Sequence, residues 1–167
     1  MLSRIEKLLI LKTVGIFLET PDDILADVAG LLDETEAPAG TTIFHKGETG
    51  TSMYIIVDGE VRVYDGMHTL NHLYARDVFG EMALLDPEPR SASITALADT
   101  LLLRLDQAPF YELMDEHNQI ARGIIRMLTR HLRARVRDLA EVRLHIATPA
   151  EPAAATLAPA YSDGQIH

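Results

Sequence analysis

The spacing of apolar residues changes twice along the chain, and each change predicts a different kind of element. Residues 2–18 carry apolar side chains at helical spacing and predict a first helix. The run Thr20-Pro21-Asp22-Asp23 predicts the start of a second helix, with Thr20 as the cap and Pro21 in the first helical position. This second helix is expected to run to about Leu32.

From Thr41 to Leu105 the pattern changes to short apolar runs separated by turns such as Asp58-Gly59 and Asp65-Gly66. The predicted strands lie at residues 53–57, 61–64, 70–73, 92–97 and 100–105. Many short strands at close spacing are typical of an antiparallel sandwich or barrel. We therefore predict an α+β fold that is mainly β: an antiparallel β-roll or jelly-roll barrel on which N-terminal and C-terminal helices pack.

Helical spacing returns after Leu105, where Pro109 suits a helix start. A long apolar stripe follows at Ile120, Ile124, Leu128, Leu132, Val136, Leu139 and Val142. The sequence then becomes rich in Ala and Pro without a period, which predicts a disordered tail. The expected organisation is a helical segment over 1–37, a β-roll over 38–106, C-terminal helices over 107–146 and the tail over 147–167.

Charge is distributed unevenly along the 167 residues, whose formal net charge is −10. Residues 1–120 carry a net charge of −13 and residues 121–145 a net charge of +5. An acidic body argues against a nucleic-acid partner. The chain has no cysteine, no apolar run long enough to span a membrane and no secretory signal pattern, so we expect a cytoplasmic protein without direct membrane insertion.

Residues 79–93 bring together groups suited to holding a phosphate joined to a sugar. Gly80 allows backbone N–H groups to approach an anion, and Met82-Ala83 begin a short helical run whose N–H groups can face it. Glu81 offers two acceptor oxygens to a ribose hydroxyl, and Arg90 offers a planar cationic fork to phosphate oxygens. Taken singly, the same residues are compatible with a turn glycine and a surface ion pair.

This stretch closely resembles the phosphate-binding cassette of cyclic nucleotide-binding domains. The likeness extends to Phe44-His45-Lys46-Gly47-Glu48 and covers roughly residues 12–140. The resemblance implies that Glu81 takes the ribose 2′-hydroxyl and Arg90 the cyclic phosphate. The remaining members of the implied cradle are Gly80, Ser91 and Ala92. The sequence departs from the family at Arg76-Asp77, where the family usually has Gly-Asp.

Position in the family also implies a pocket wall formed by Val63, Leu70, Asn71 and Phe79. For the three apolar residues an ordinary core position is an equal alternative, whereas a buried Asn71 amide would need a partner. The same comparison places Arg135 where the last helix meets the base, on which a guanidinium can stack or to whose edge it can donate.

The resemblance implies a sensor that binds cyclic AMP, with cyclic GMP as the alternative because Ser91 suits either purine. The helix over 120–145 is expected to close over the pocket, to pair with its twin in a homodimer and to signal to an unknown effector protein. Two alternatives remain: a ligand-free structural or dimerisation domain, or the regulatory module of a larger transporter or channel-like protein. The histidine spacing matches no metal site and no nucleophile motif is present, so we expect no enzyme and no metal or other cofactor.

Overall fold

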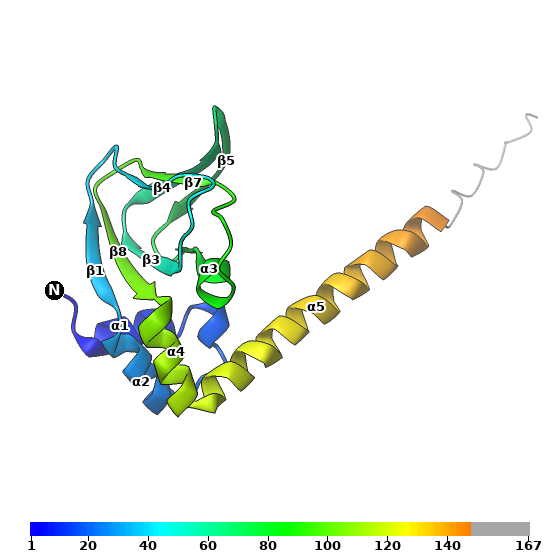
Figure 1. Ribbon diagram of the computed structural model, residues 1–167. Coiled ribbons are helices and arrows are strands. Elements are labelled where there is room, and N and C mark those ends of the chain that lie inside the picture. The colour runs from blue at the N-terminus through cyan, green and yellow to red at the C-terminus, as the bar shows by residue number, and fades with distance from the viewer. Residues whose placement is uncertain (148–167) are drawn as a thin grey trace, which may run out of the picture. The chain divides into compact units, whose positions relative to one another are not determined.

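Two four-stranded antiparallel sheets form the β-roll in the computed structural model, which describes residues 1–147 (Figure 1). The first sheet has the order β1-β8-β3-β6, with β1 at Asp33–Ala37, β8 at Thr100–Asp106, β3 at Ser52–Asp58 and β6 at Val78–Phe79. The second has the order β2-β7-β4-β5, with β2 at Thr42–Phe44, β7 at Ser93–Ala96, β4 at Glu60–Asp65 and β5 at His68–Tyr74.

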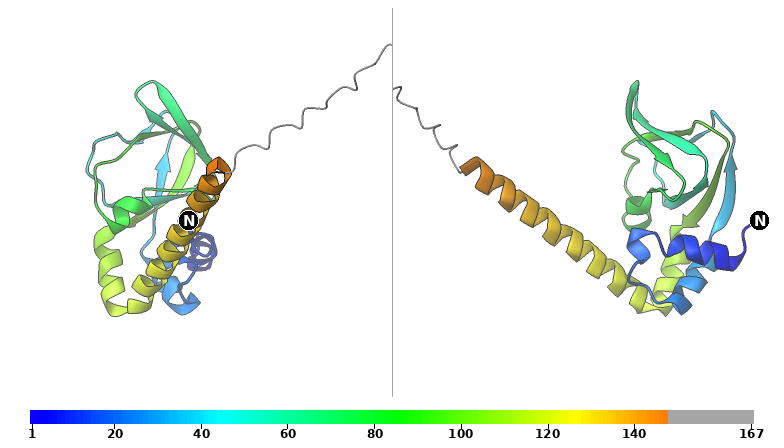
Figure 2. Two further views of the ribbon diagram at one scale, coloured as in Figure 1. Left: turned by 90° about the vertical axis from the view of Figure 1, so that its right-hand side faces the viewer. Right: turned by 180° about the vertical axis from the view of Figure 1, so that it is seen from behind.

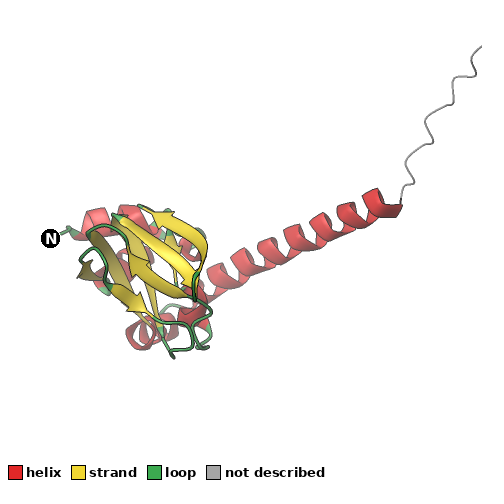
Figure 3. Ribbon diagram, turned by 90° about the horizontal axis from the view of Figure 1, so that it is seen from above, coloured by secondary structure: helices red, strands yellow, loops and turns green. Residues whose placement is uncertain are grey.

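The apolar faces of the two sheets pack against each other. Figure 3 shows the strands of the roll from above. This core combines Phe44 and Ile94 from the second sheet with Phe79 and Leu102 from the first. Strand alternation explains it, because every second side chain of each strand points into the roll. The antiparallel β-roll predicted from the sequence is confirmed.

Within the first unit, four helices and the first turns of a fifth gather at one end of the roll (Figures 1 and 2). They are α1 (Arg4–Leu11), the 3₁₀ helix η1 (Gly15–Phe17), α2 (Asp22–Gly30), α4 (Gln107–Glu116) and α5 (Asn118–Ala147). A second apolar core joins them to β3 and β8, and in it the rings of Phe17 and Phe110 meet edge to face at 5.8 Å between centroids. The short helix α3 (Glu81–Leu85) lies on the roll itself and contacts β3.

Residue contacts divide the chain into one unit over Met1–Arg130 and a second unit from His131 onward. Helix α5 is continuous through this boundary. Its first turns belong to the core of the first unit, where Ile120, Ile124 and Met127 are buried. In the second unit all its residues except the half-buried Ala134 are exposed, including the apolar Leu132, Leu139 and Val142.

The structure differs from the sequence prediction at the N-terminal end. The first helix stops at Leu11, because β-branched Thr13 and Val14 followed by Gly15 are poor helix formers, and the chain continues as η1. Thr20 does not cap the second helix: Pro21 occupies the cap position and the Thr20 side chain is buried.

Three strands were not among those predicted from the apolar pattern. Residues 33–37, expected within a helical segment, form β1 and pair with β8. Strands β2 and β6 are only three and two residues long, too short for a period to show. The tail predicted over 147–167 lies, apart from Ala147, outside the described residues.

Candidate functional site

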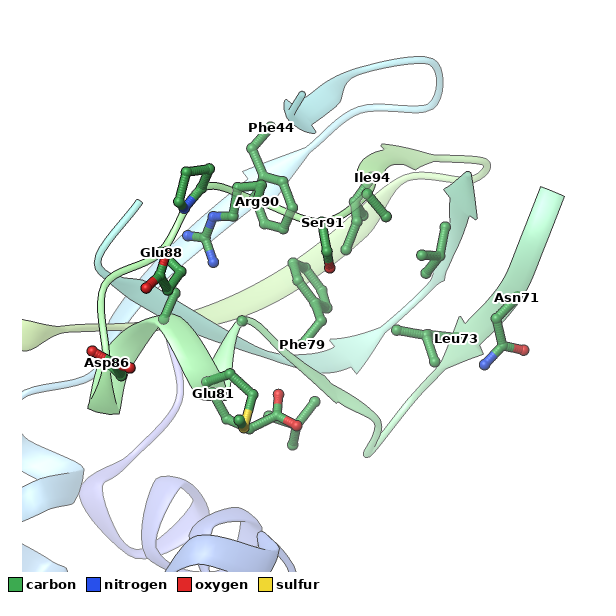
Figure 4. A pocket seen from close by; sticks show the side chains of 17 residues that line it. Phe44, Asn71, Leu73, Phe79, Glu81, Asp86, Glu88, Arg90, Ser91 and Ile94 are labelled. Carbon is green, nitrogen blue, oxygen red and sulfur yellow. The ribbon is translucent and has the colours of Figure 1, made fainter. Parts of the chain in front are cut away.

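A pocket of about 540 Å³ opens between the 79–92 stretch and the strands of the second sheet. Figure 4 shows Arg90 and Phe44 on one side, and Asn71 and Leu73 of β5 on the opposite side. Glu81 and Ser91 lie at the pocket between them. The pocket therefore has a cationic end and a wall of strands, and that wall is mainly apolar through Val63, Leu73, Val78 and Ile94.

Gly80 turns the chain sharply from β6 into α3. Its φ of 80° lies in the left-handed region that favours glycine. A Cβ at this position would lie 2.7 Å from the Ser52 carbonyl oxygen and 2.8 Å from Nη1 of Arg90. Both the backbone turn and the close approach of Arg90 therefore require a residue without a side chain here.

The Arg90 guanidinium is buried beside this turn, with only 8% of the residue exposed. Its Nη2 donates to the Ser52 carbonyl oxygen at 2.9 Å, and its Cζ lies 4.1 Å from the centroid of the Phe44 ring. A ring face attracts a cation, so Phe44 supports the charge from one side. On another side Gly50 leaves room, since a Cβ there would lie 2.4 Å from Nε and Nη2.

The backbone of Arg90 is fixed as firmly as its side chain. Its N–H donates to the Glu48 carbonyl oxygen and its own carbonyl oxygen accepts from the Gly47 N–H, both at 2.8 Å. A bridge between Thr49 and Pro89 joins the same two segments. The turn over residues 45–50 therefore determines where the arginine enters the pocket.

Arg90 has an unsatisfied donor. Among the described residues, no group accepts a hydrogen bond from its buried Nε. Burial lowers the pKa of the Arg90 guanidinium, an effect that nearby Tyr54 and Glu48 oppose, yet arginine remains charged in proteins. A buried cation with a free donor calls for an anionic partner, because a buried polar group without one is costly.

Glu81 is the first residue of α3 and its carboxylate borders the pocket. Within residues 1–147 no side chain or backbone group hydrogen bonds to that carboxylate. No Glu81–Arg90 ion pair forms among these residues, so they do not adopt the surface ion pair that the sequence left as an alternative. Both groups remain available to a ligand, one as an acceptor and the other as a donor.

Ten of the twelve residues predicted to bind ligand line this pocket. They are Val63, Asn71, Phe79, Gly80, Glu81, Met82, Ala83, Arg90, Ser91 and Ala92. Leu70 does not border it: Asn71 and Leu73 share one face of β5, so Leu70 faces the other way and is 59% exposed. Arg135 belongs to the second unit, and its contact with a ligand stays a prediction.

Sequence reasoning missed the residues that surround the Arg90 side chain: Phe44, Gly50 and Ser52. Phe44 belonged to the recognised motif, but nothing in its local sequence indicates the contact. Asp86 and Glu88 also line the pocket. Tyr54 stacks on Phe79 at 5.1 Å between centroids and so supports the pocket from behind.

Comparison with known proteins gives a consistent result. Residues 34–117 match the family described as "cyclic nucleotide-binding domain". The chain belongs to this family.

A CRP-like cAMP-activated global transcriptional regulator of Mycobacterium tuberculosis is 30% identical over 138 residues, which cover 80% of this chain and 62% of the regulator. A cyclic nucleotide-gated potassium channel of Rhizobium etli is 36% identical over 111 residues, covering 66% of this chain and 31% of the channel. The N-terminal domain of a transcriptional regulator from Streptomyces coelicolor has a TM-score of 0.71 at 25% identity, covering 77% of this chain and 93% of that domain. This chain thus spans about three fifths of the first relative and a third of the second.

The described residues contain neither a membrane-spanning helix nor a metal-binding cluster. Across residues 1–147, no helix is both long and apolar enough to cross a bilayer. In the same part of the chain, no group of three or more His, Asp or Glu side chains is arranged to hold a metal ion.

Proposed function

We propose that this chain is a sensor that binds a 3′,5′-cyclic mononucleotide reversibly in the Arg90 pocket. The observation that carries the proposal is the buried Arg90 guanidinium, which faces the pocket with Nε unpartnered among the described residues. A cyclic phosphate supplies two acceptor oxygens and one negative charge to such a group. The acidic body of the chain opposes anions in general, so local contacts must supply the affinity.

Each part of the ligand has a matching part of the pocket. Arg90 donates to the phosphate, and the hydroxyl of Ser91 together with the backbone near Gly80 completes its cradle. Glu81 accepts from the ribose 2′-hydroxyl. The base lies against the apolar wall that includes Val63 and Leu73, where burial of its faces contributes to affinity.

Cyclic AMP is the ligand we propose, with cyclic GMP as the alternative. The name of the mycobacterial relative as a cAMP-activated regulator supports this choice. Cyclic GMP stays open because the hydroxyl of Ser91 suits both purines.

We further propose that the ligand acts by moving the C-terminal helix over the pocket, with Arg135 reaching the base. A ligand shifts a conformational equilibrium only by its different affinity for the two states. Closure of the helix on bound nucleotide would provide that difference.

The exposed stripe of α5 supports a homodimer as the form that signals. Apolar residues alternate at spacings of three and four through Ile125, Leu128, Leu132, Leu139, Val142 and Ile146, which are 43–79% exposed. This is a heptad seam, interrupted once by Arg135. In a parallel pair of such helices Asp138 of one copy would lie beside Arg143 of the other, so the flanking charges complement each other.

The two alternatives make different predictions. A ligand-free structural domain would bind no nucleotide. A regulatory module of a larger transporter or channel-like protein would bind nucleotide but act on another part of its polypeptide. The relative from Rhizobium etli, a cyclic nucleotide-gated channel, is the observation behind this alternative. We propose a binding protein without enzymatic activity, located in the cytoplasm and acting on a protein effector rather than on nucleic acid.

Isothermal titration with cyclic AMP, cyclic GMP and 5′-AMP tests the proposal. We expect saturable binding of a cyclic nucleotide at one site per chain and much weaker binding of 5′-AMP, whose open phosphate carries more charge and a different shape. A folded, nucleotide-free protein that binds none of the three would favour the ligand-free structural domain.

A further inference from the structure

The position of the Arg90 guanidinium depends on a hydrogen-bonded chain that leads away from the pocket. Its Nη2 donates to the carbonyl oxygen of Ser52 at 2.9 Å. Within the described residues, this is the one hydrogen bond that the Arg90 side chain makes. The location of the Ser52 carbonyl therefore determines where the fork points.

Ser52 is held in turn by Asp106. The two residues face each other in the β3–β8 register, and Ser52 Oγ donates to Asp106 Oδ1 at 2.5 Å. The Asp106 carboxylate also accepts from Arg104, from Nε at 2.8 Å and from Nη2 at 2.6 Å. The hydrogen bond from Arg104 is the main reason that the pKa of Asp106 lies below its usual value. The carboxylate is thus ionised at neutral pH, and charge-assisted bonds are the stronger kind.

An aspartate at a helix N-cap normally accepts a hydrogen bond from the first turn, but Asp106 does not. It occupies the N-cap of α4, yet its side chain makes no capping hydrogen bond to the first turn of that helix. Its oxygens are directed to Ser52 and Arg104 instead. The next residue strengthens the same junction, because the Gln107 N–H donates to the Thr51 carbonyl oxygen at 3.1 Å.

We propose that Ser52 and Asp106 are positioning residues for the anion site: they fix the carbonyl that orients Arg90, without touching the ligand themselves. This inference rests on the proposed function, because its effect on affinity requires an anion at Arg90. It also places the start of α4 in direct connection with the ligand site, since Asp106 is the last residue before that helix.

Cyclic AMP titrations of Ser52→Ala and Asp106→Asn test the proposal. We expect each substitution to weaken binding roughly fivefold to tenfold, about the effect of one lost hydrogen bond. Ser52→Thr keeps a hydroxyl and should bind within about twofold of the parent chain. Asp65→Asn is the matched control, because Asp65 pairs with Lys46 on the exposed surface of the roll. Unchanged binding in both test variants, or an equal loss in Asp65→Asn, would overturn the proposal.

A spectroscopic readout separates positioning from general destabilisation. The buried Nε–H of Arg90 should give a slowly exchanging proton–nitrogen NMR signal in the ligand-free parent chain, and this signal should shift and exchange faster in Ser52→Ala and in Asp106→Asn. A signal unchanged in both variants would contradict the positioning role. This measurement needs no ligand, so it still tests the positioning of Arg90 if the parent chain proves not to bind cyclic nucleotides and the proposed function fails.

Discussion

A Cβ atom on Gly50 would lie 2.4 Å from both Nε and Nη2 of Arg90. Real Cβ atoms do not approach other atoms so closely, so the guanidinium occupies space that only a glycine leaves free. Gly50 has no positive φ, which means that the requirement comes from the neighbouring side chain and not from backbone conformation. The glycine thus acts on the ligand site through sterics alone.

Gly50→Ala should therefore displace Arg90 and weaken cyclic nucleotide binding at least tenfold, while the fold survives. Gly15→Ala is the matched control, because nothing lies within 4 Å of a Cβ there and its φ is also negative. Titration calorimetry and thermal unfolding of both variants make the comparison. If Gly50→Ala binds as tightly as Gly15→Ala, the steric account of the Arg90 site is wrong.

Among residues 1–147, Arg76 is the one non-glycine residue with a positive φ, which is 79°. It stands where the family usually has glycine, and the turn forms nonetheless, with the Arg76 N–H donating to the Ile56 carbonyl oxygen at 2.8 Å. The left-handed conformation costs an L-residue about 1–2 kcal/mol, a cost that glycine avoids. Part of this gain in stability is offset because glycine has greater conformational freedom in the unfolded chain. We expect Arg76→Gly to raise the free energy of unfolding by roughly 0.5–1 kcal/mol.

Arg76→Ala serves as the comparison for that substitution. It removes the same side chain but keeps the Cβ and hence the strain. Urea unfolding of the three proteins should show stabilisation in the glycine variant only; equal stability of the alanine and glycine variants would show that strain is not the cause.

The lowered pKa of Asp106 predicts an acid dependence of stability. A carboxyl whose pKa is lower in the folded state contributes stability above its unfolded pKa of about 3.9, and this contribution disappears as pH falls through the folded value. The stability difference between the parent chain and Asp106→Asn should thus be largest near neutral pH and shrink below about pH 4. Unfolding curves between pH 7 and pH 3 test this, and a constant difference over that range would contradict the assignment.

The heptad seam of α5 predicts self-association. Leu132 and Leu139 are 65% and 64% exposed in a single copy, and a paired helix would cover them. Light scattering after size exclusion should give a dimer for the parent chain and a monomer for the double variant Leu132→Asp, Leu139→Asp. Leu70→Asp changes a leucine of similar exposure on β5 and should remain dimeric. A monomeric parent chain at micromolar concentration would contradict the dimer proposal.

Local sequence predicted the elements whose apolar pattern is long and regular. Strands β3, β4 and β8 and the C-terminal helices follow from such patterns. Strand β1 has the sequence Asp-Glu-Thr-Glu-Ala, in which only Ala37 is buried, so an edge strand with charged side chains shows no period. Thr20 resembled a cap, but the helix begins beyond Pro21 and tertiary packing buries the threonine.

The candidate site was predictable where its residues are contiguous and not where distant segments meet. Gly80, Glu81 and Arg90 were predicted because they lie within one contiguous motif. The groups that orient Arg90 come from the start of β3 and from the end of β8, and no local pattern connects Ser52 with Asp106. Leu70 and Asn71 were both predicted at the pocket, yet neighbours in a strand face opposite ways. The pocket therefore includes Asn71 and, in place of Leu70, Leu73.

The central claim is that Arg90 binds the phosphate of a cyclic nucleotide, and a calorimetric comparison of two arginine variants tests it most directly. Arg90→Ala removes the buried fork, whereas Arg62→Ala removes a guanidinium on β4 that lies over Tyr64 and does not line the pocket. We predict saturable cyclic AMP binding in the parent chain and in Arg62→Ala, and a loss of at least a hundredfold in Arg90→Ala, in keeping with a desolvated charge-assisted contact. Equal affinity of the parent chain and Arg90→Ala would contradict the account.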